Sequence, residues 1–261
     1  MGKKTVVFGS FVVDLMGRTP HLPAAGETVK GTVFKMGPGG KGFNQGVAAH
    51  KAGADVTMVT KLGRDTFADI ALNTMKELGM KQDRILYSDD TETGCALIMV
   101  DENTSQNEIV VILGSCNTIS DAEVDSLEDL LDGCEYMLTQ LETNVSSVER
   151  IVDIACKKGV KVILNTAPVQ PISDELLSKV DLITPNEVEA EILTGVKVDS
   201  EEAADKAAEW FFGKGVKRVL ITLGGRGVYI NTGDKKGIIP AYKVNAIDTT
   251  GAGDAFNGGL L

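Results

Sequence analysis

Short apolar runs rich in β-branched residues alternate along this chain with segments of helical periodicity, and this alternation limits the possible folds more than any other feature. Each run is short enough to be one buried strand, and several helical patterns end at a glycine. We expect strands within residues 4–10, 55–63, 134–142, 160–168, 180–186 and 217–227, and helices within 41–53, 66–79, 145–159 and 201–215. Such repeats form right-handed crossovers. The sequence therefore predicts an α/β fold, a mostly parallel sheet flanked by helices.

Two segments interrupt the alternation because they lack a helical period. They are "RTPHLPAAGETVKGTVFKMG" (18–37) and "TETGCALIMVDENTSQNEIVVILGS" (91–115), and the second indicates two strands joined by the polar turn "DENTSQN". Both could belong to the main sheet. We favour a small β-sheet that forms a lid over the site, with lid segments at about 12–36 and 92–114. No linker is evident, so we expect one domain over 1–261.

Charge and cysteine content exclude several classes of protein. The net charge of -11 argues against broad contact with nucleic acid or with an anionic membrane. No apolar run is long enough to span a bilayer. The cysteines, Cys95, Cys116, Cys134 and Cys156, lie far apart without a C-x-x-C pair. Neither a zinc site nor a disulfide framework is expected, and a cytoplasmic location is predicted.

The stretch "DTTGAGDAFNGGLL" (248–261) crowds glycines around an aspartate where we expect a helix to begin. Backbone N–H groups in the first turn of a helix lack intrahelical partners, and the helix dipole is positive there. Gly251, Ala252 and Gly253 would let these groups face a transferring phosphoryl group. Asp254 could then accept the proton of an attacking hydroxyl. The alternative is a glycine-rich turn in which Asp254 only complements the dipole.

A second glycine cluster, "GPGGKGFNQG" (37–46), precedes a predicted helix. It is not a P-loop, because Lys41 is followed by Gly42 rather than by serine or threonine, and no G-x-G-x-x-G follows the first strand. The backbone N–H groups of Gly39 and Gly40, with Lys41 and Asn44, could bind the hydroxyls of a polar ligand. The alternative is a loop leading into a helix, with a solvated lysine.

A third cluster, "TPNEVEAE" (184–191), follows a predicted strand. Asn186 is suited to cap a helix, and Glu187, Glu189 and Glu191 suit its first turns. Capping and surface charge explain most of this pattern. A carboxylate placed after a strand could also hold magnesium through water.

Two carboxylates and a glycine turn follow other predicted strands. Asp14 and Glu142 could each accept two sugar hydroxyls, or could be ordinary turn residues. The turn "TLGGRG" (222–227) leaves room for a flat base, and a β-hairpin is expected there in either case.

Taken in order, "GGKGFNQGVAAHKAGADV", "TPNEVEAE", "TLGGRGV" and "DTTGAGDAFNGGL" resemble the ribokinase-like carbohydrate kinases of the phosphofructokinase-B type. The resemblance runs from about Val6 to the last residue, and "GGKGFNQ", "LTQLET" and "NTAP" look most like the ribokinases. It implies one ribokinase-like domain with a Rossmann-like sheet and a β-lid. The implied reaction is ATP-dependent phosphorylation of an exocyclic hydroxyl of a small sugar, with ribose the first candidate. Another sugar, a sugar acid, a nucleoside, or an inactive sugar-binding or regulatory role are the alternatives.

The resemblance also implies roles for individual residues. Asp254 is implied as the general base, with Gly251, Ala252 and Gly253 as the anion hole. The implied sugar-binding residues are Asp14, Gly40, Lys41, Asn44 and Glu142. The implied nucleotide-binding residues are Asn186, Thr222, Leu223, Gly224, Gly225, Arg226 and Gly227. Glu189 organises Mg²⁺ through water, and Asp248 and the backbone of Thr250 bind an activating K⁺. The implied partners are the sugar and ATP, with no nucleic acid or membrane. A homodimer joined through the lids is also implied.

Two departures from the family pattern bear on specificity and extent. Members usually read "GSINAD" or "GSINMD" after the first strand, with the asparagine touching the sugar, whereas "GSFVVD" here puts Val12 at that position. One lost sugar contact costs about 1 kcal/mol. The family also continues for some tens of residues beyond the GAGD helix, so the C-terminal part of its fold is expected to be missing from this chain.

Overall fold

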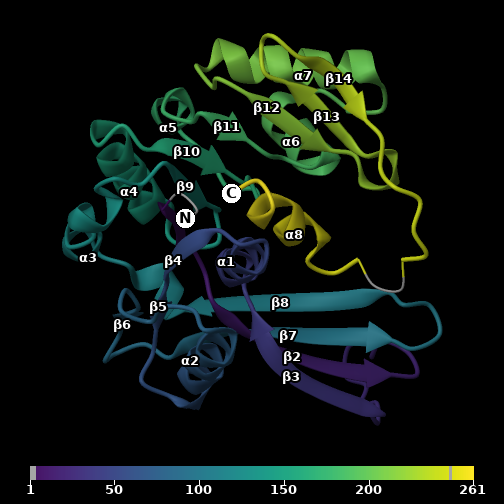
Figure 1. The fold of residues 1–261 in the computed structure, drawn as a ribbon. Coiled ribbons are helices and arrows are strands. Elements are labelled where there is room, and N and C mark those ends of the chain that lie inside the picture. The colour runs from purple at the N-terminus through teal and green to yellow at the C-terminus, as the bar shows by residue number, and fades with distance from the viewer. Residues whose placement is uncertain (1–3, 247–248) are drawn as a thin grey trace.

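The computed structural model describes residues 4–246 and 249–261, and an eight-stranded sheet forms its centre (Figure 1). The strands lie in the order β14-β13-β12-β11-β10-β9-β1-β4. Their bounds are β1 Lys4–Phe8, β4 Asp55–Val59, β9 Tyr136–Thr139, β10 Lys161–Leu164, β11 Leu182–Ile183, β12 Val219–Thr222, β13 Val228–Asn231 and β14 Lys236–Ile239. Neighbours from β4 through β12 are parallel, and β13 and β14 form an antiparallel edge. The predicted α/β fold class is confirmed.

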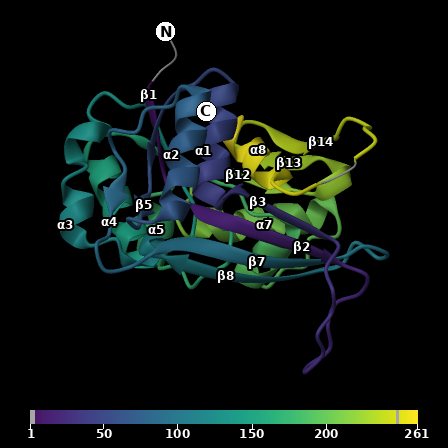
Figure 2. The same ribbon diagram turned by 90° about the horizontal axis from the view of Figure 1, so that it is seen from below.

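Helices cover both faces of this sheet because its strands are apolar on both faces (Figure 2). In β1, Val6 and Phe8 pack into one core and Val7 into the other, since successive side chains of a strand point to opposite faces. On the Val7 face lie α1 Lys41–Lys51, α2 Thr66–Leu78 and α8 Ala252–Gly258; on the other lie α3 Asp121–Asp125, α4 Val145–Lys157, α5 Asp174–Ser178, α6 Glu187–Thr194 and α7 Glu201–Gly213.

Most of these helices begin at a residue with a capping side chain. In α2, the Asp65 carboxylate accepts a hydrogen bond from the Ala68 N–H at 2.9 Å, and Gly79 ends the helix in the left-handed conformation with φ 73°. Short 3₁₀ helices lie at η1 Ser115–Thr118, η2 Glu128–Leu131 and η3 Gly224–Arg226, and a two-stranded sheet joins β5 Lys61–Leu62 to β6 Leu86–Tyr87.

A second sheet has the strand order β3-β2-β7-β8 and is built from residues 12–39 and 93–114, which include most of the two segments that interrupt the alternation. Its strands are β2 Val12–Thr19, β3 Val33–Gly39, β7 Thr93–Asp101 and β8 Asn107–Gly114. Because β1 continues after three residues into β2, this small sheet lies at the edge where the parallel strands have their carboxyl ends (Figure 1). Within the described ranges, no helix has both the length and the hydrophobicity needed to cross a membrane.

Candidate active site

Asp254 lies in the first turn of α8, beside the start of α1. Its Oδ2 accepts a hydrogen bond from the Asn44 side-chain amide at 3.1 Å, and its Oδ1 accepts one from the Gln45 amide at 3.0 Å. Gly251 begins the helix with φ 72°, a left-handed conformation that favours glycine. The Ala252 N–H donates to the Thr249 carbonyl at 3.1 Å, so this amide already has a protein partner.

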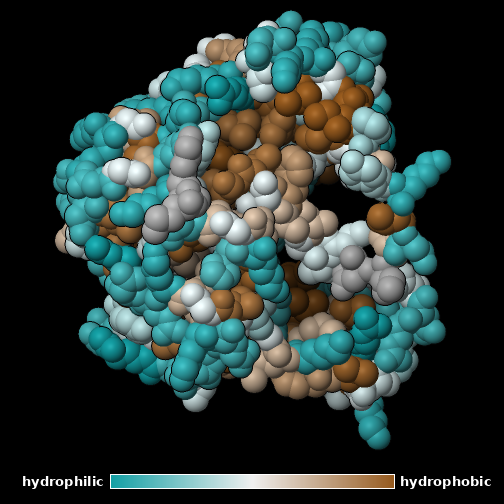
Figure 3. Space-filling model, in the orientation of Figure 1, coloured by the Kyte–Doolittle hydropathy of each residue, from teal (hydrophilic) through white to brown (hydrophobic). Residues whose placement is uncertain are grey.

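Two cavities meet at Asp254, which lies at the carboxyl-end edge of the main sheet, where open α/β folds bind ligands. The first measures about 500 Å³ and lies between α1, α2, α8 and the small sheet, where Figure 3 shows the surface hollowed. It is lined by Asp14, Pro38, Phe43, Asn44, Val47, Ala48, Lys51, Thr74, Glu77, Leu78, Thr250, Gly251, Asp254 and Ala255. The second measures about 220 Å³. It is lined by Lys41, Asn165, Ala167, Thr184, Asn186, Glu189, Thr222, Thr249, Gly251, Ala252, Gly253, Asp254 and Asn257.

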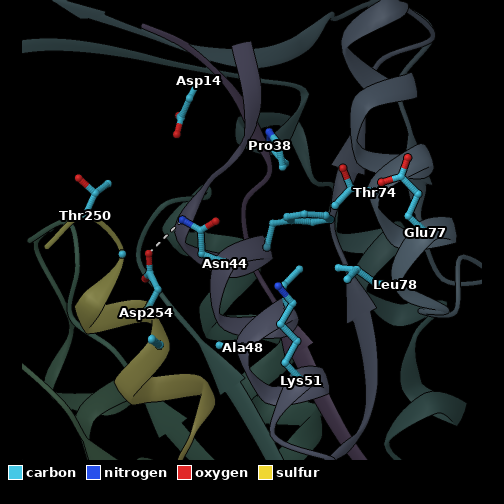
Figure 4. A pocket seen from close by; sticks show the side chains of 14 residues that line it. Asp14, Pro38, Asn44, Ala48, Lys51, Thr74, Glu77, Leu78, Thr250 and Asp254 are labelled. Atoms are coloured by element: carbon cyan, nitrogen blue, oxygen red, sulfur yellow. Dashed lines mark hydrogen bonds between the residues drawn. The ribbon is translucent and has the colours of Figure 1, made fainter. Parts of the chain in front are cut away.

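Asp14 and Asp254 face the first cavity from opposite walls, with Asn44 between them (Figure 4). The pKa of Asp14 is raised above its ordinary value, first by burial and then by the negative charges of Glu142 and Asp254. A Cβ on Gly39 would lie 2.3 Å from Asp14 Oδ1, so the carboxylate lies directly over the glycine loop. The structure thus brings together three side chains that were predicted separately from the sequence.

Glu142 holds the glycine loop from behind. Its Oε2 accepts hydrogen bonds from the Ser10 hydroxyl at 2.6 Å and from the Lys41 N–H at 2.8 Å, and its side chain is buried. A Cβ on Gly42 would lie 2.5 Å from the Ser10 nitrogen, so only glycine lets α1 pack this closely against the turn after β1. Glu142 is not among the described residues that line either cavity, and Lys41 lines the second cavity rather than the first.

Asn186 and Glu189 form a reciprocal capping box at the start of α6. Asn186 Oδ1 accepts from the Glu189 N–H at 2.8 Å, and Glu189 Oε2 accepts from the Asn186 N–H at 3.0 Å and from the Thr166 hydroxyl at 2.9 Å. The predicted capping role is therefore present, and both residues also line the second cavity. Across residues 4–246 and 249–261, no three His, Cys, Asp or Glu side chains cluster as a metal cage.

A third, mostly apolar cavity of about 470 Å³ adjoins the second through Thr222, Ala252 and Gly253. Its lining comprises Thr222, Gly224, Gly227, Val228, Ile239, Pro240, Ala241, Tyr242, Ala252, Gly253 and Phe256. Figure 3 shows apolar side chains over the hairpin formed by β12 and β13. The predicted hairpin is present as β12, η3 and β13.

Within the turn 222–227, three of the predicted nucleotide-binding residues do not line the third cavity. The Leu223 side chain is buried and Gly225 lines none of the cavities described above. Arg226 forms an ion pair with Glu187 and donates to the carbonyls of Val198 and Asp199, so its guanidinium is held away from this cavity.

The remaining predicted positions lie at the margins of the site. Thr250 lines the first cavity, whereas its predicted partner Asp248 lies outside the described residues. Val12 is buried in β2 and is not among the residues that line the first two cavities.

A buried polar network behind Asp254 was not predicted from the sequence. Gln45 donates to Asn165 Oδ1 at 3.1 Å as well as to Asp254, and it accepts from the Gln140 amide at 2.7 Å. Asn165 donates in turn to the Thr184 carbonyl at 2.8 Å. Two signals could have indicated this network: Gln45 directly follows Asn44 in the glycine-rich stretch, and Asn165 directly follows a parallel strand.

Comparison with known proteins gives a consistent result. The model of the pfkB family carbohydrate kinases matches residues 3–261. The chain is 43% identical over 261 residues to a ribokinase of Haemophilus influenzae, which covers 100% of this chain and 85% of the relative. It is 38% identical over 253 residues to a deoxyribokinase of Salmonella typhi, and this match covers 97% of this chain and 82% of that relative. A solved structure of Arabidopsis thaliana ribokinase complexed with ribose and ATP matches with a TM-score of 0.89 at 29% identity, covering 99% and 84%.

Proposed function

Since the chain belongs to the pfkB family of carbohydrate kinases and is an ATP-dependent sugar kinase, we propose that it phosphorylates an exocyclic hydroxyl of ribose, with Asp254 as the base. The observation that carries this proposal is the place of Asp254 on the wall shared by two cavities. An acceptor hydroxyl in one cavity and a phosphoryl donor in the other would meet at this carboxylate. Ribokinases among the relatives support ribose as the acceptor.

The first cavity is proposed as the sugar site. Asp14 and Asn44 would bind sugar hydroxyls, joined by the backbone of Gly40 and by Lys41 at the edge, while Glu142 would hold the loop that carries them. Asp254 would take the proton as the oxygen attacks in line, and positioning would supply much of the rate. The small sheet would act as a lid that excludes competing water.

The second and third cavities are proposed as the ATP site. The phosphates would occupy the second cavity, where the positive end of the α8 dipole, at Gly251, Ala252 and Gly253, would stabilise the charge of the transferring group. The adenine ring of ATP would lie in the third cavity, against the turn from Thr222 to Gly227. Leu223, Gly225 and Arg226 would shape that turn and not contact the nucleotide through their side chains.

Magnesium fits this site as an ion that keeps most of its waters. Asn186 and Thr166 already donate to both oxygens of Glu189, and the described residues form no cage of three acidic or histidine ligands. Mg²⁺ bound by phosphates, with Glu189 reached through water, agrees with that arrangement. The ion would neutralise charge on the phosphates. A K⁺ bound by Asp248 and the Thr250 backbone is part of the proposal through family resemblance alone.

A homodimer through the small sheet is also proposed. The face of this sheet that points away from Asp14 carries exposed apolar side chains, with exposed fractions of 70% for Phe34, 54% for Met36, 47% for Leu97, 58% for Val110 and 46% for Ile112. A contiguous apolar face of this kind is typical of a protein interface. We also assign a cytoplasmic location, on the basis of four cysteines that form no disulfide.

We propose deoxyribose as a second acceptor, because a deoxyribokinase is among the relatives and because Val12, although it does not line the first cavity, lies close to Asp14 in β2. This residue lies two positions before Asp14 in β2, and side chains two positions apart in a strand share a face. Valine offers no partner to a hydroxyl, so an acceptor lacking one hydroxyl loses nothing there. We expect Val12→Asn to raise the ribose-to-deoxyribose ratio of kcat/KM by about five- to tenfold. An unchanged ratio would remove Val12 from acceptor selection.

The test is sugar-dependent ADP release across pentoses, hexoses and sugar acids, with Asp254→Asn beside the wild type. Removal of a general base should lower kcat by about 10²- to 10⁴-fold. Asp234→Asn, in an exposed turn, is the matched control and should retain full activity. If folded wild-type protein released no ADP with any sugar of the panel, the kinase proposal would be overturned. If the kcat of Asp254→Asn were within tenfold of the wild-type value, the role of Asp254 would be overturned.

A further inference from the structure

We propose that Gln45 is a positioning residue that fixes the Asp254 carboxylate, so that Oδ2 faces the sugar cavity as the proton acceptor. The proposal rests on the proposed function, because it assumes that Asp254 is the base. Gln45 is fully buried, and its side-chain nitrogen donates both to Asp254 Oδ1 at 3.0 Å and to Asn165 Oδ1 at 3.1 Å. It is therefore not a contact residue for the sugar.

The ionised Asp254 carboxylate determines how the side-chain amides of this hydrogen-bonded network are oriented. An ionised carboxylate only accepts hydrogen bonds, so the Gln45 nitrogen must face it and Gln45 Oε1 must face the other way. There Oε1 accepts from the Gln140 nitrogen at 2.7 Å. Turning the Gln45 amide over would place oxygen against the carboxylate and nitrogen against nitrogen. The Gln45 amide is thus held in a single orientation.

Asn165 also holds the Gln45 nitrogen in place. Asn165 donates its own amide to the Thr184 carbonyl at 2.8 Å, so its oxygen stays directed at Gln45. Gln45, Gln140 and Asn165 are all buried, and buried hydrogen bonds of this kind are strong and costly to leave unmade. Gln140 Oε1 ends the chain of bonds and has no partner among the described residues.

The two oxygens of Asp254 consequently have different surroundings. Oδ1 is bound by a buried donor from behind, whereas Oδ2 is bound by Asn44, which lines the sugar cavity. A carboxylate without the Gln45 contact could rotate about its Cβ–Cγ bond, and the reacting oxygen would leave its line of approach. A misplacement of about 1 Å in a catalytic group can cost about 10²-fold in rate.

The test compares the wild type with Gln45→Met, which keeps the size of the side chain but removes its donor. We expect kcat to fall about 10- to 100-fold while KM for sugar and for ATP stays within threefold, because only the placement of the base changes. Gln45→Glu keeps the acceptor for Gln140 but removes the donor to Asp254, and it carries the test if the methionine variant fails to fold. A kcat within threefold of wild type in either folded variant would overturn the proposal.

A double-mutant cycle separates positioning from general damage. In the Asp254→Asn background, Gln45→Met should lower the residual single-turnover rate by less than threefold, since no base remains to be positioned. An equal loss in both backgrounds would overturn the proposal. Ala49→Gly, one turn along α1 from Gln45, weakens the same helix without a polar contact to Asp254 and should leave kcat unchanged. Failure of the proposed function would appear separately, as an inactive wild type or an active Asp254→Asn.

Discussion

Asn44 donates its side-chain amide to Asp254 across 3.1 Å, although the two residues are 210 positions apart in the chain. One lies in α1 and the other in α8, and both line the first cavity. The group proposed to bind the acceptor therefore also contacts the group proposed to deprotonate it.

Asn44→Leu removes both interactions while keeping the approximate size of the side chain. Loss of hydrogen bonds that involve a charged group should lower kcat/KM for the sugar by about 10- to 100-fold, while KM for ATP stays nearly unchanged. Steady-state kinetics with each substrate varied in turn measures this. Asn103→Leu, in an exposed turn where the amide donates to the Pro20 carbonyl, is the matched control. A sugar kcat/KM equal to that of the control would count against the site.

The raised pKa of Asp14 predicts that sugar binding weakens as the pH falls. The ionised carboxylate is the form that accepts sugar hydroxyls, and burial and the charges of Glu142 and Asp254 make it protonate at a higher pH than an ordinary aspartate. Calorimetric titration of the sugar at decreasing pH should show that its affinity begins to fall while the pH is still above the usual aspartate pKa of about 3.9. Asp14→Asn should lower affinity more than about tenfold at neutral pH. Affinity that stays constant down to the usual aspartate range would contradict the prediction.

The same pKa predicts an effect on stability. A carboxyl whose pKa is higher folded than unfolded lowers the free energy of unfolding above its folded pKa, and this penalty disappears below its unfolded pKa. Asp14→Asn should therefore raise the melting temperature at neutral pH and give no gain near pH 3, that is, below about 3.9. Asp234, whose pKa is lowered mainly by the Thr232 hydroxyl, should show the opposite sign when changed to asparagine. Differential scanning calorimetry at both pH values measures the two signs.

Gly42→Ala should destabilise the protein, because the new Cβ would lie 2.5 Å from backbone atoms of Gly9 and Ser10. Forced overpacking of this kind typically costs about 1–3 kcal/mol, or several degrees in melting temperature. Gly213→Ala is the same substitution at the end of α7, where nothing lies within 4 Å of the added Cβ. That variant should be stabilised by up to about 1 kcal/mol. Equal melting temperatures for the two variants would mean that close packing at Gly42 is not required.

Val110→Asp should convert the proposed dimer to a monomer, because a charge would be buried at the centre of the apolar face of the small sheet. Ile192→Asp, on α6, changes a side chain of similar exposure, 62% against 58% for Val110, away from that sheet. Light scattering after size-exclusion chromatography should show a monomer for the first variant and a dimer for the second. A monomeric wild type would contradict the dimer.

Regular periodicity predicted the larger elements well. The helix expected over residues 66–79 is observed as Thr66–Leu78, since Asp65 caps one end and Gly79 ends the other through local chemistry. The helices α3 and α5 were not predicted, because five residues are too few to display a helical period. Their capping serines, Ser120 and Ser173, were the available signal.

The site was predicted as a list of residues and not as an arrangement. "GGKGFNQG" and "GAGD" each indicated polar chemistry, but the contacts of Gln45 with Asp254 and Asn165 arise from packing of α1 against α8 and β10. No local pattern encodes such long-range contacts. Arg226 illustrates the converse, since its motif suggested a nucleotide contact and Glu187 from another element holds it elsewhere.

Of the described residues, the first and second cavities share only Gly251 and Asp254. The acceptor side is otherwise built mainly from α1, α2 and the small sheet, and the donor side mainly from the strand ends around β10 to β12, while α8 and the residues before it contribute different side chains to each. Mutations can therefore accumulate on one side while the other, and the carboxylate between them, stays intact. A gene with this layout can diverge toward new sugars through duplication without having to reinvent its use of ATP.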